Sequence, residues 1–543
     1  MRTRTRWAWS SSVLTVLTAL FGIADAGSAE NPPAWRDCVA GCLDTLIERG
    51  TDVYWPEKTP LLMSVIDVRT MDSPEKPDLV DSLIRFEDRL HRRGERGSNL
   101  WNDQPTLRAM YALSQRTGDP KYARAADAYI EYALRHCRKK NGLLVWGSHI
   151  HWDCYRDRAG GDRDGEAPHE ILIFLPVWEE MYRLNPGVVR QQAELIWKWH
   201  VHDKEHGRHN RHDDGRPGAD FPFSGGSFVL SFAFVNSVTP SDKEWLRRAR
   251  LVADWHWRHR DPTTNLTAFV PGAGGLYGRT FATAITGPHA VQLLRSYELT
   301  GDPHFRDIAV GYLKAYGRYG WDEETQTYIG MLNLDGTPTT RDQVPDDMKS
   351  QLAGGEKEPD PGYSVPPIGP VDVWPTTIFP LDFPLLTAQA YLYAYELTAT
   401  EDGAGNEELL DAARRWARLI ERNLPPDTGW TFREAFAKAL PESRLTQGTY
   451  AQNYGRAISF FVHLYRATGE KRYLRIAEEL GLEALDKLYV KTRISPPGGS
   501  SREYGIFRGH PAKPYYEAGN GVGILLLALL ELDDPDGESL GAF

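Results

Sequence analysis

A short phrase that recurs along the chain limits the possible folds more than any other feature of the sequence. It reads YALSQRTGDPKY at 111–122, YELTGDPHF at 297–305 and YRATGEKRY at 465–473, with weaker copies at 182–186 and 395–398. In the strong copies a glycine suits the left-handed residue that ends a helix, and the first two add an aspartate and a proline that begin the next helix well. The recurrence therefore predicts helical hairpins joined by tight turns.

The segments after these turns have the apolar spacing of amphipathic helices. Apolar residues keep near-helical spacing through 122–133, and the same pattern returns at 305–313. Hairpins that dominate a chain of 543 residues predict an all-α fold, either an open solenoid or a closed ring of paired helices, the (α/α) toroid. The uneven spacing of the phrase favours the ring.

Both ends of the chain and one internal stretch depart from the hairpin pattern. Residues 1–29 combine arginines, an apolar run and small residues, the layout of a secretory signal peptide, so we expect export to the periplasm or the medium. Residues 319–380 are rich in Pro, Gly, Asp and Thr and predict a loop-rich insertion with short strands at the rim. The toroid domain is expected at 30–533, followed by a C-terminal tail at 534–543.

Charge and composition argue against several partners. The formal net charge of −11 opposes a nucleic acid held by general electrostatic attraction, but it leaves room for an acidic carbohydrate in a locally positive cleft. The apolar run 522–532 is too short to span a bilayer and predicts a buried core helix, so we expect no membrane anchor. The four cysteines fit export, although the sequence leaves any disulfide pairing open. We expect a monomer.

Histidines gather in one part of the chain and suggest chemistry there. Between His149 and His212 lie eight of the 16 histidines, and within this stretch His149, Glu170 and the adjacent pair Arg211 and His212 read as a metal site beside a base. Two neutral imidazoles and one carboxylate suit Mn²⁺, Zn²⁺ or a related ion and leave coordination positions for substrate. The spacing alone does not choose the metal.

Other interpretations of this stretch remain open from the residues alone. The histidines are compatible with satisfied structural groups or with a solvated face. His151 stands two residues from His149, and Arg208 with His209 repeats the Arg-His pair one turn earlier. The register of the site is therefore not fixed by the pattern.

The order and spacing of the four residues resemble the signature of polysaccharide lyase family 2, the metal-dependent pectate lyases built on an (α/α)7 toroid. His149, Glu170, Arg211 and His212 follow one another as that family's ligand His, ligand Glu, catalytic Arg and second ligand His do. The resemblance extends to chain length, to the repeated helices and to the segment YEAGNG at 516–521. It implies an (α/α)7 toroid that cleaves pectate, or polygalacturonate.

The resemblance also implies a role for each residue. His149, Glu170 and His212 would bind a divalent ion, Mn²⁺ before other transition metals, with Glu517 approaching the same site. Arg211 would remove the C5 proton of a uronate in a β-elimination, because that proton is poorly acidic until the charge developing beside the carboxylate is neutralised. Arginine normally keeps its proton, so a bidentate clamp on a substrate carboxylate is the alternative role for Arg211.

One further arginine and two further function classes complete the hypotheses. Arg279, in the segment GLYGRT, is a candidate contact for a second uronate or a plain surface residue. A glycoside hydrolase on the same toroid would use two facing carboxylates, for which the candidates are Asp153, Asp157, Asp213 and Asp214. A non-catalytic carbohydrate-binding scaffold, with structural histidines, is the third class.

Overall fold

The computed structural model describes most of the chain after the predicted signal peptide. The described residues are 35–54, 57–74, 97–171, 173–273, 275–283, 285–344, 368–374, 383–399, 405–426, 448–495 and 499–543. The predicted signal peptide therefore lies outside the described residues, as do 345–367 and 375–380 of the predicted insertion. None of the described helices is long and apolar enough to cross a membrane.

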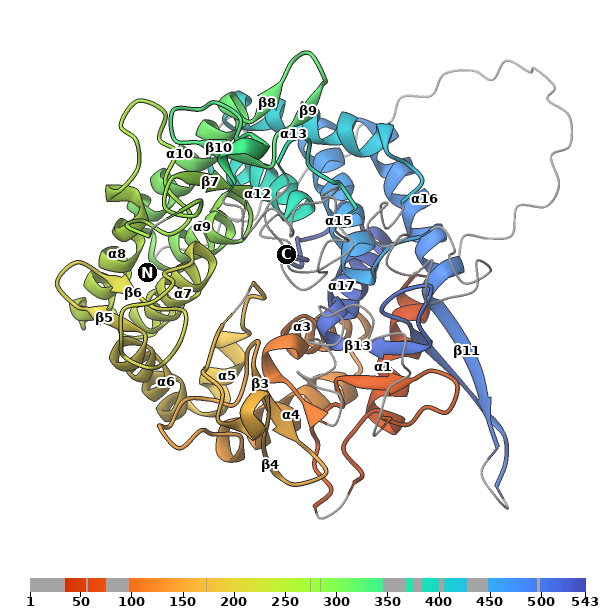
Figure 1. The fold of residues 1–543 in the computed structure, drawn as a ribbon. Helices are drawn as coiled ribbons and strands as arrows, with labels where there is room; N and C mark the ends of the chain where they lie inside the picture. Colours follow the sequence, from red (N-terminus) through yellow and green to blue (C-terminus); the bar gives the residue numbers. More distant parts are fainter. Residues whose placement is uncertain are drawn as a thin grey trace, which may run out of the picture. The chain divides into compact units, whose positions relative to one another are not determined.

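Fourteen α-helices in the described residues form a closed ring in two layers (Figure 1). The inner layer consists of α3 (Leu100–Thr117), α5 (Trp178–Leu184), α7 (Pro222–Val238), α9 (Ala290–Thr300), α12 (Pro384–Leu397), α15 (Ala451–Thr468) and α17 (Val522–Asp533). The outer layer consists of α1 (Trp35–Arg49), α4 (Lys121–His136), α6 (Pro186–Trp199), α8 (Lys243–Arg258), α10 (Pro303–Tyr319), α13 (Glu407–Arg422) and α16 (Lys471–Leu488).

Packing between the first and last parts of the chain closes the ring. Helix α17 packs on α3 and on α1, and each other inner helix pairs with the outer helix that follows it in the chain. The described helices thus form seven pairs, which confirms the expected all-α (α/α) toroid. In Figure 1 the closure lies where the blue α17 meets the orange α3.

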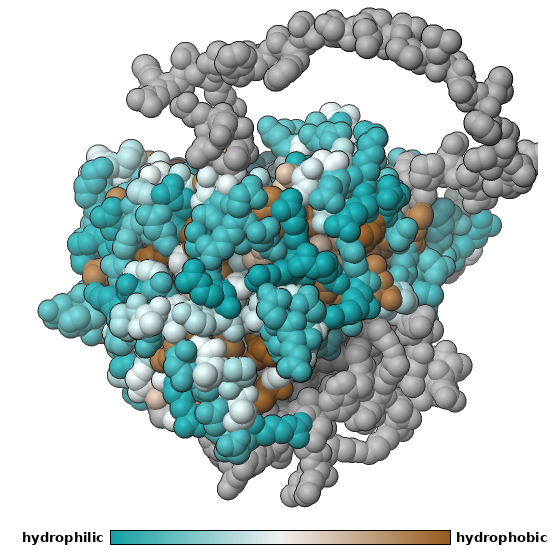
Figure 2. Space-filling model, turned by 90° about the horizontal axis from the view of Figure 1, so that it is seen from above, coloured by the Kyte–Doolittle hydropathy of each residue, from teal (hydrophilic) through white to brown (hydrophobic). Residues whose placement is uncertain are grey.

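The inner helices α7 and α17 are buried on all sides, whereas the outer helix α13 is buried on one face. In α7 every residue from 222 to 236 is buried, and in α17 every residue from 522 to 532 is buried, as the apolar run predicts. The outer α13 buries one face and exposes the other, as expected for an amphipathic helix that covers a core. Figure 2 accordingly shows a mostly hydrophilic face on which hydrophobic residues form small separate areas.

The predicted turns lie at the ends of inner helices. Gly118, Gly301 and Gly469 have φ angles of 74°, 68° and 71° and close α3, α9 and α15. The side chain of Asp302 accepts a hydrogen bond from the backbone N–H of His304 and caps α10. These short connections all lead from an inner helix to an outer one.

The connections from outer to inner helices are long and carry the strands. These are β1 (Val65–Asp67), β2 (Gly97–Ser98), β3 (Ile150–Asp153), β4 (Arg158–Gly161), β5 (Val201–Asp203), β6 (Arg208–His209), β7 (Thr280–Ala282), β8 (Trp321–Asp322), β9 (Thr327–Tyr328), β10 (Met331–Asn333), β11 (Tyr489–Ile494), β12 (Arg502–Phe507) and β13 (Tyr515–Glu517). They pair antiparallel in small sheets, in the orders β1-β13, β10-β7, β11-β12, β2-β3-β4, β5-β6 and β8-β9. Because each such connection ends at the start of an inner helix, the long loops share one end of the ring.

The C-terminal segment packs against the ring. Ala542 is buried and its carbonyl accepts a hydrogen bond of 2.7 Å from Gln389. The ring of Phe543 stacks on Tyr393 with centroids 4.8 Å apart. The four cysteines, Cys38, Cys42, Cys137 and Cys154, are free thiols.

Candidate metal centre

The long connection between α4 and α5 brings His149 and Glu170 side by side. His149 directly precedes β3, and Glu170 forms a parallel bridge with Gly147. The backbone N–H of Ser148 donates to the carbonyl of Glu170 at 3.0 Å. Gly147 has a φ of 114°, and a Cβ there would lie 1.9 Å from the Glu170 carbonyl oxygen. The close approach of the two segments therefore requires glycine at this position.

Arg211 and His212 come from the loop between β6 and α7. The backbone N–H of Arg211 donates to the carbonyl of Ala219 at 2.8 Å, which closes the loop on itself. The backbone N–H of His212 donates to the side-chain oxygen of Asn210 at 3.1 Å. These bonds fix where the two side chains leave the backbone.

His149, Glu170 and His212 form a compact set of potential metal ligands. One ligand atom from each lies within 4.8 Å of the others. The Nε2 of His149 is 2.8 Å from a Glu170 carboxylate oxygen, and the two imidazole rings lie 5.6 Å apart at 73°. The Nε2 of His212 is buried and has no hydrogen-bond partner among the described residues. A buried ring nitrogen without a partner is unfavourable in a protein but suits a metal ligand.

The hydrogen bonding of His149 also fits a cation at this place. Its Nδ1 lies 2.9 Å from a carboxylate oxygen of Asp162, which can only accept, so Nδ1 carries a proton. The Nε2 that faces Glu170 then carries a lone pair. This lone pair would repel the carboxylate oxygen opposite it, and a proton or a metal ion between the two atoms would remove the repulsion. Such a carboxylate-histidine contact behind a ligand is the usual support of protein metal sites.

Charge favours the forms of these residues that bind metals. Burial alone would raise the pKa of Glu170, but Arg211 and the two histidines hold this pKa well below its ordinary value. Burial lowers the pKa of His212, although Glu170 opposes this effect. The carboxylate is therefore charged and this imidazole neutral, as metal coordination requires. The donor set fits a divalent transition-metal ion.

Arg211 contacts the same carboxylate and reaches the surface. One guanidinium nitrogen lies 3.2 Å from the second carboxylate oxygen of Glu170. The guanidinium lies over the ring of Phe221, 4.7 Å from its centroid, and its side chain is 32% exposed. A substrate carried at the ligand set could therefore meet this guanidinium.

Two predicted residues lie outside this group. Glu517 is on β13, where its buried carboxylate contacts Lys513 at 3.3 Å and accepts a hydrogen bond from Asn520. It is not a member of the ligand set, and its approach to the metal residues stays a prediction. Arg279 is exposed before β7 and donates to the carbonyl of Gln343.

The alternative histidines, His151 and His209, do not join the set of potential metal ligands. His151 lies within β3 opposite Gly160, His209 faces the carbonyl of Phe221 at 3.3 Å, and neither belongs to the group. Arg208 instead approaches Asp220 at 3.4 Å. The structure thus brings together His149, Glu170 and His212 with Arg211, and not the alternative residues.

The carboxylates considered for hydrolysis have structural contacts. Asp213 accepts hydrogen bonds from Lys139 and Asn141, both at 2.7 Å. Asp214 accepts a hydrogen bond from Asn210, and Asp153 pairs with Arg156. Asp157 accepts a hydrogen bond from the backbone N–H of Glu57.

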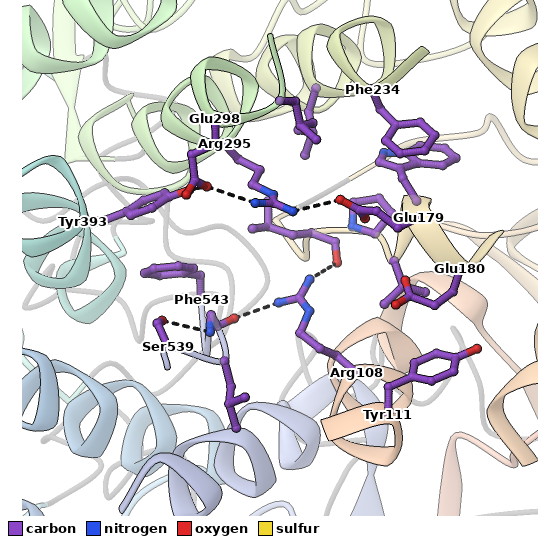
Figure 3. A pocket seen from close by; sticks show the side chains of 18 of the residues that line it. Arg108, Tyr111, Glu179, Glu180, Phe234, Arg295, Glu298, Tyr393, Ser539 and Phe543 are labelled. Carbon is purple, nitrogen blue, oxygen red and sulfur yellow. Dashed lines mark hydrogen bonds and ion pairs between the residues drawn. The ribbon is translucent and has the colours of Figure 1, made fainter. Parts of the chain in front are cut away.

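A cavity of about 370 Å³ lies at the other end of the ring, and none of the residues of the candidate metal centre lines it (Figure 3). It is lined by the C-terminal halves of α7, α9 and α12 and by the C-terminal segment. Arg295 bridges Glu179 at 2.9 Å and Glu298 at 3.0 Å across it. Arg108 donates to the carbonyls of Leu175 and Gly541 and so ties the C-terminal segment to the inner helices.

The sequence analysis missed the supporting residues of the site. Asp162, Ser148 and Phe221 contact the predicted residues, yet each lies in a loop whose sequence carries no pattern. Only the tertiary structure shows their proximity.

Comparison with solved structures gives distant carbohydrate-active enzymes. A family 76 glycoside hydrolase from a bovine Bacteroides thetaiotaomicron strain is 13% identical, with a TM-score of 0.42 over 92% of this chain and 78% of that chain. A D-mannose isomerase is 10% identical, with a TM-score of 0.43 over 93% of this chain and 100% of that chain. An unsaturated glucuronyl hydrolase from Bacillus sp. GL1 is 13% identical, with a TM-score of 0.38 over 80% of this chain and 86% of that chain.

Comparison with protein families is more specific. Residues 83–224 match the family model described as periplasmic pectate lyase. The matched segment contains His149, Glu170, Arg211 and His212. The part of the chain that carries the candidate metal centre is thus similar to the periplasmic pectate lyases, as the resemblance of the sequence predicts.

Proposed function

We propose that this protein is a metal-dependent pectate lyase that cleaves polygalacturonate by β-elimination. The observation that carries the proposal is that His149, His212 and Arg211 all gather around the carboxylate of Glu170. The family match over this segment supports the same activity. We further propose that residues 30–533 act as one exported, monomeric catalytic domain in the periplasm.

The ligand set would hold a divalent ion, with Mn²⁺ as our first choice. When bound, the ion supplies positive charge that neutralises the uronate carboxylate and the charge developing at C5. His149, Glu170 and His212 would hold it from three different backbone segments. Asp162 holds His149 in the tautomer whose Nε2 is available.

Arg211 is proposed to take the C5 proton onto a guanidine nitrogen. The electron pair of the broken C5–H bond forms the C4=C5 double bond, the C4–O bond breaks, and the departing oxygen takes a proton from water. Among the described residues the acidic partner of Arg211 is Glu170, which is also the carboxylate of the ligand set. Arg279 is proposed as the contact for a second uronate.

The test is the ultraviolet absorbance of the conjugated C4=C5 product during incubation with polygalacturonate. We expect absorbance to rise with Mn²⁺, to stop with a chelator and to be absent in Arg211→Ala. Arg208→Ala is the matched control, because Arg208 is 31% exposed and pairs with Asp220 outside the ligand set. New reducing ends without the absorbance would indicate hydrolysis and overturn the proposal. A raised KM with unchanged kcat in Arg211→Ala would make Arg211 a substrate clamp.

A further inference from the structure

A chain of buried hydrogen bonds lies beneath the candidate metal centre. The indole N–H of Trp146 donates to Nε2 of His169 at 2.6 Å. The Nδ1 of His169 is 2.8 Å from Nε2 of His200, and Nδ1 of His200 is 3.0 Å from the carbonyl of Asn210. Trp146, His169 and His200 are completely buried, and Asn210 is 3% exposed. The chain therefore runs without access to water.

The two end groups of this series of hydrogen bonds determine which ring nitrogen of each histidine carries a proton. An indole nitrogen can only donate and a carbonyl oxygen can only accept. His169 therefore accepts at Nε2 from Trp146, and His200 donates from Nδ1 to Asn210. The remaining bond is satisfied when Nδ1 of His169 donates to Nε2 of His200. Both imidazoles are then neutral, and the chain has one direction and no unsatisfied nitrogen.

Both ends of this series of hydrogen bonds are covalently next to residues of the candidate metal centre. Trp146 precedes the Gly147 that packs on Glu170, and His169 is the residue directly before Glu170. Asn210 directly precedes Arg211, and its side chain accepts from the backbone of His212. The chain thus links the backbones of the three segments that supply the ligands and the base.

A second bond joins two of the same segments. Asp213, the residue after His212, accepts a hydrogen bond of 2.8 Å from the backbone N–H of His169. Lys139, 2.7 Å from the other carboxylate oxygen, anchors Asp213 to the end of α4. The segments around Glu170 and His212 are therefore joined both by His200 and by Asp213.

We propose that Trp146, His169 and His200 are positioning residues that set the distance between Glu170 and the Arg211–His212 pair, and thereby the affinity of the site for a divalent ion. They hold backbone segments, whereas the ligand set itself consists of other residues. The inference rests on the metal site of the proposed function. It predicts that breaking the chain loosens the site without unfolding the ring.

The experiment replaces His200 by phenylalanine, which fills a similar volume but neither donates nor accepts. Mn²⁺ binding to the full chain is measured by titration calorimetry, and folding by circular dichroism and thermal denaturation. Loss of support behind metal ligands typically weakens affinity by about 10- to 100-fold. We expect a weakening in this range for His200→Phe, and partial recovery for His200→Gln, which keeps one donor and one acceptor.

The matched control is His256→Phe. His256 is equally buried and its ring lies 5.7 Å from that of His209, but it is not part of the hydrogen bonds that run from Trp146 to Asn210. We expect its substitution to leave the Mn²⁺ affinity unchanged. An unchanged affinity in folded His200→Phe, or the same loss in His256→Phe, would overturn the inference.

A second measurement separates this inference from the proposed function. In ¹⁵N-labelled wild-type protein the ring N–H protons of His169 and His200 should be protected from exchange and should reside on Nδ1. Their absence or a different tautomer would overturn the inference whether or not the protein cleaves pectate. Wild-type protein that binds Mn²⁺ but yields no unsaturated product would refute the proposed function alone.

Discussion

Gly147→Ala is predicted to disable the metal centre while leaving the ring folded. The Cβ of an alanine at 147 would lie 1.9 Å from the Glu170 carbonyl oxygen, where ordinary contacts begin at 3.4 Å. The backbone at 147 fixes the position of the Cβ, and the oxygen belongs to the backbone at 170. One segment must therefore move by roughly 1 to 2 Å, whereas metal-ligand distances tolerate changes of only about 0.2 Å. We expect Mn²⁺ affinity to fall by at least about 100-fold, consistent with the effect of misplacements of about 1 Å on reacting groups.

The same substitution should destabilise the protein only moderately. A non-glycine residue with a φ of 114° costs about 1–3 kcal/mol in backbone strain, and the seven helix pairs do not depend on the bridge between Gly147 and Glu170. Thermal denaturation and Mn²⁺ titration on one preparation separate the two effects.

Gly118→Ala is the matched control for strain without a clash. Gly118 has a φ of 74°, but a Cβ there would meet nothing within 4 Å. We expect a loss of about 1 kcal/mol in stability and unchanged Mn²⁺ affinity. Wild-type affinity in Gly147→Ala would refute the argument that this close approach places Glu170.

Three further predictions concern pH and the C-terminal segment. Because burial lowers the pKa of His212 below 6.5, Mn²⁺ affinity should hold through neutral pH and fall only on further acidification, as titration at several pH values will show. Burial opposes the charged form of His463, but Glu396 and Glu531 raise the pKa of this residue from 6.5 to about 10. Burial likewise opposes the charged form of Glu531, but His463 lowers the pKa of this carboxylate from 4.5 to about 2. Stability from this pair is therefore complete between pH 4.5 and 6.5 and declines toward pH 10 and pH 2, so His463→Gln should destabilise most in that window in urea unfolding. Phe543→Ala should lower stability by about 2–4 kcal/mol through lost packing on Tyr393, and an unchanged melting temperature would show that the segment adds nothing to the ring.

The sequence alone determined the helical hairpins and the buried C-terminal helix. Gly118, Gly301 and Gly469 end helices because a left-handed residue is a local requirement that glycine meets without strain. The largely apolar 522–532 segment was expected to be buried, and it forms an inner helix. Turn and helix signals depend on neighbouring residues, so a sequence displays them directly.

The sequence also identified the residues of the centre, but through their order rather than their distances. His149, Glu170, Arg211 and His212 were chosen by resemblance in spacing, and the structure brings them together. The same resemblance suggested Glu517, whose carboxylate contacts Lys513 and Asn520 in the structure. Linear order carries no information on how far two loops stand apart.

Only the tertiary structure decided how the centre is held. The contact of Asp162 with His149 and the approach of Gly147 to Glu170 fold the connection between α4 and α5 back on itself. The hydrogen bonds from Trp146 through His200 to Asn210 join this connection to the one that precedes α7. Their geometry depends on how the ring brings the starts of its inner helices together at one end. A site built between loops is therefore specified by long-range packing, which no local pattern of residues encodes.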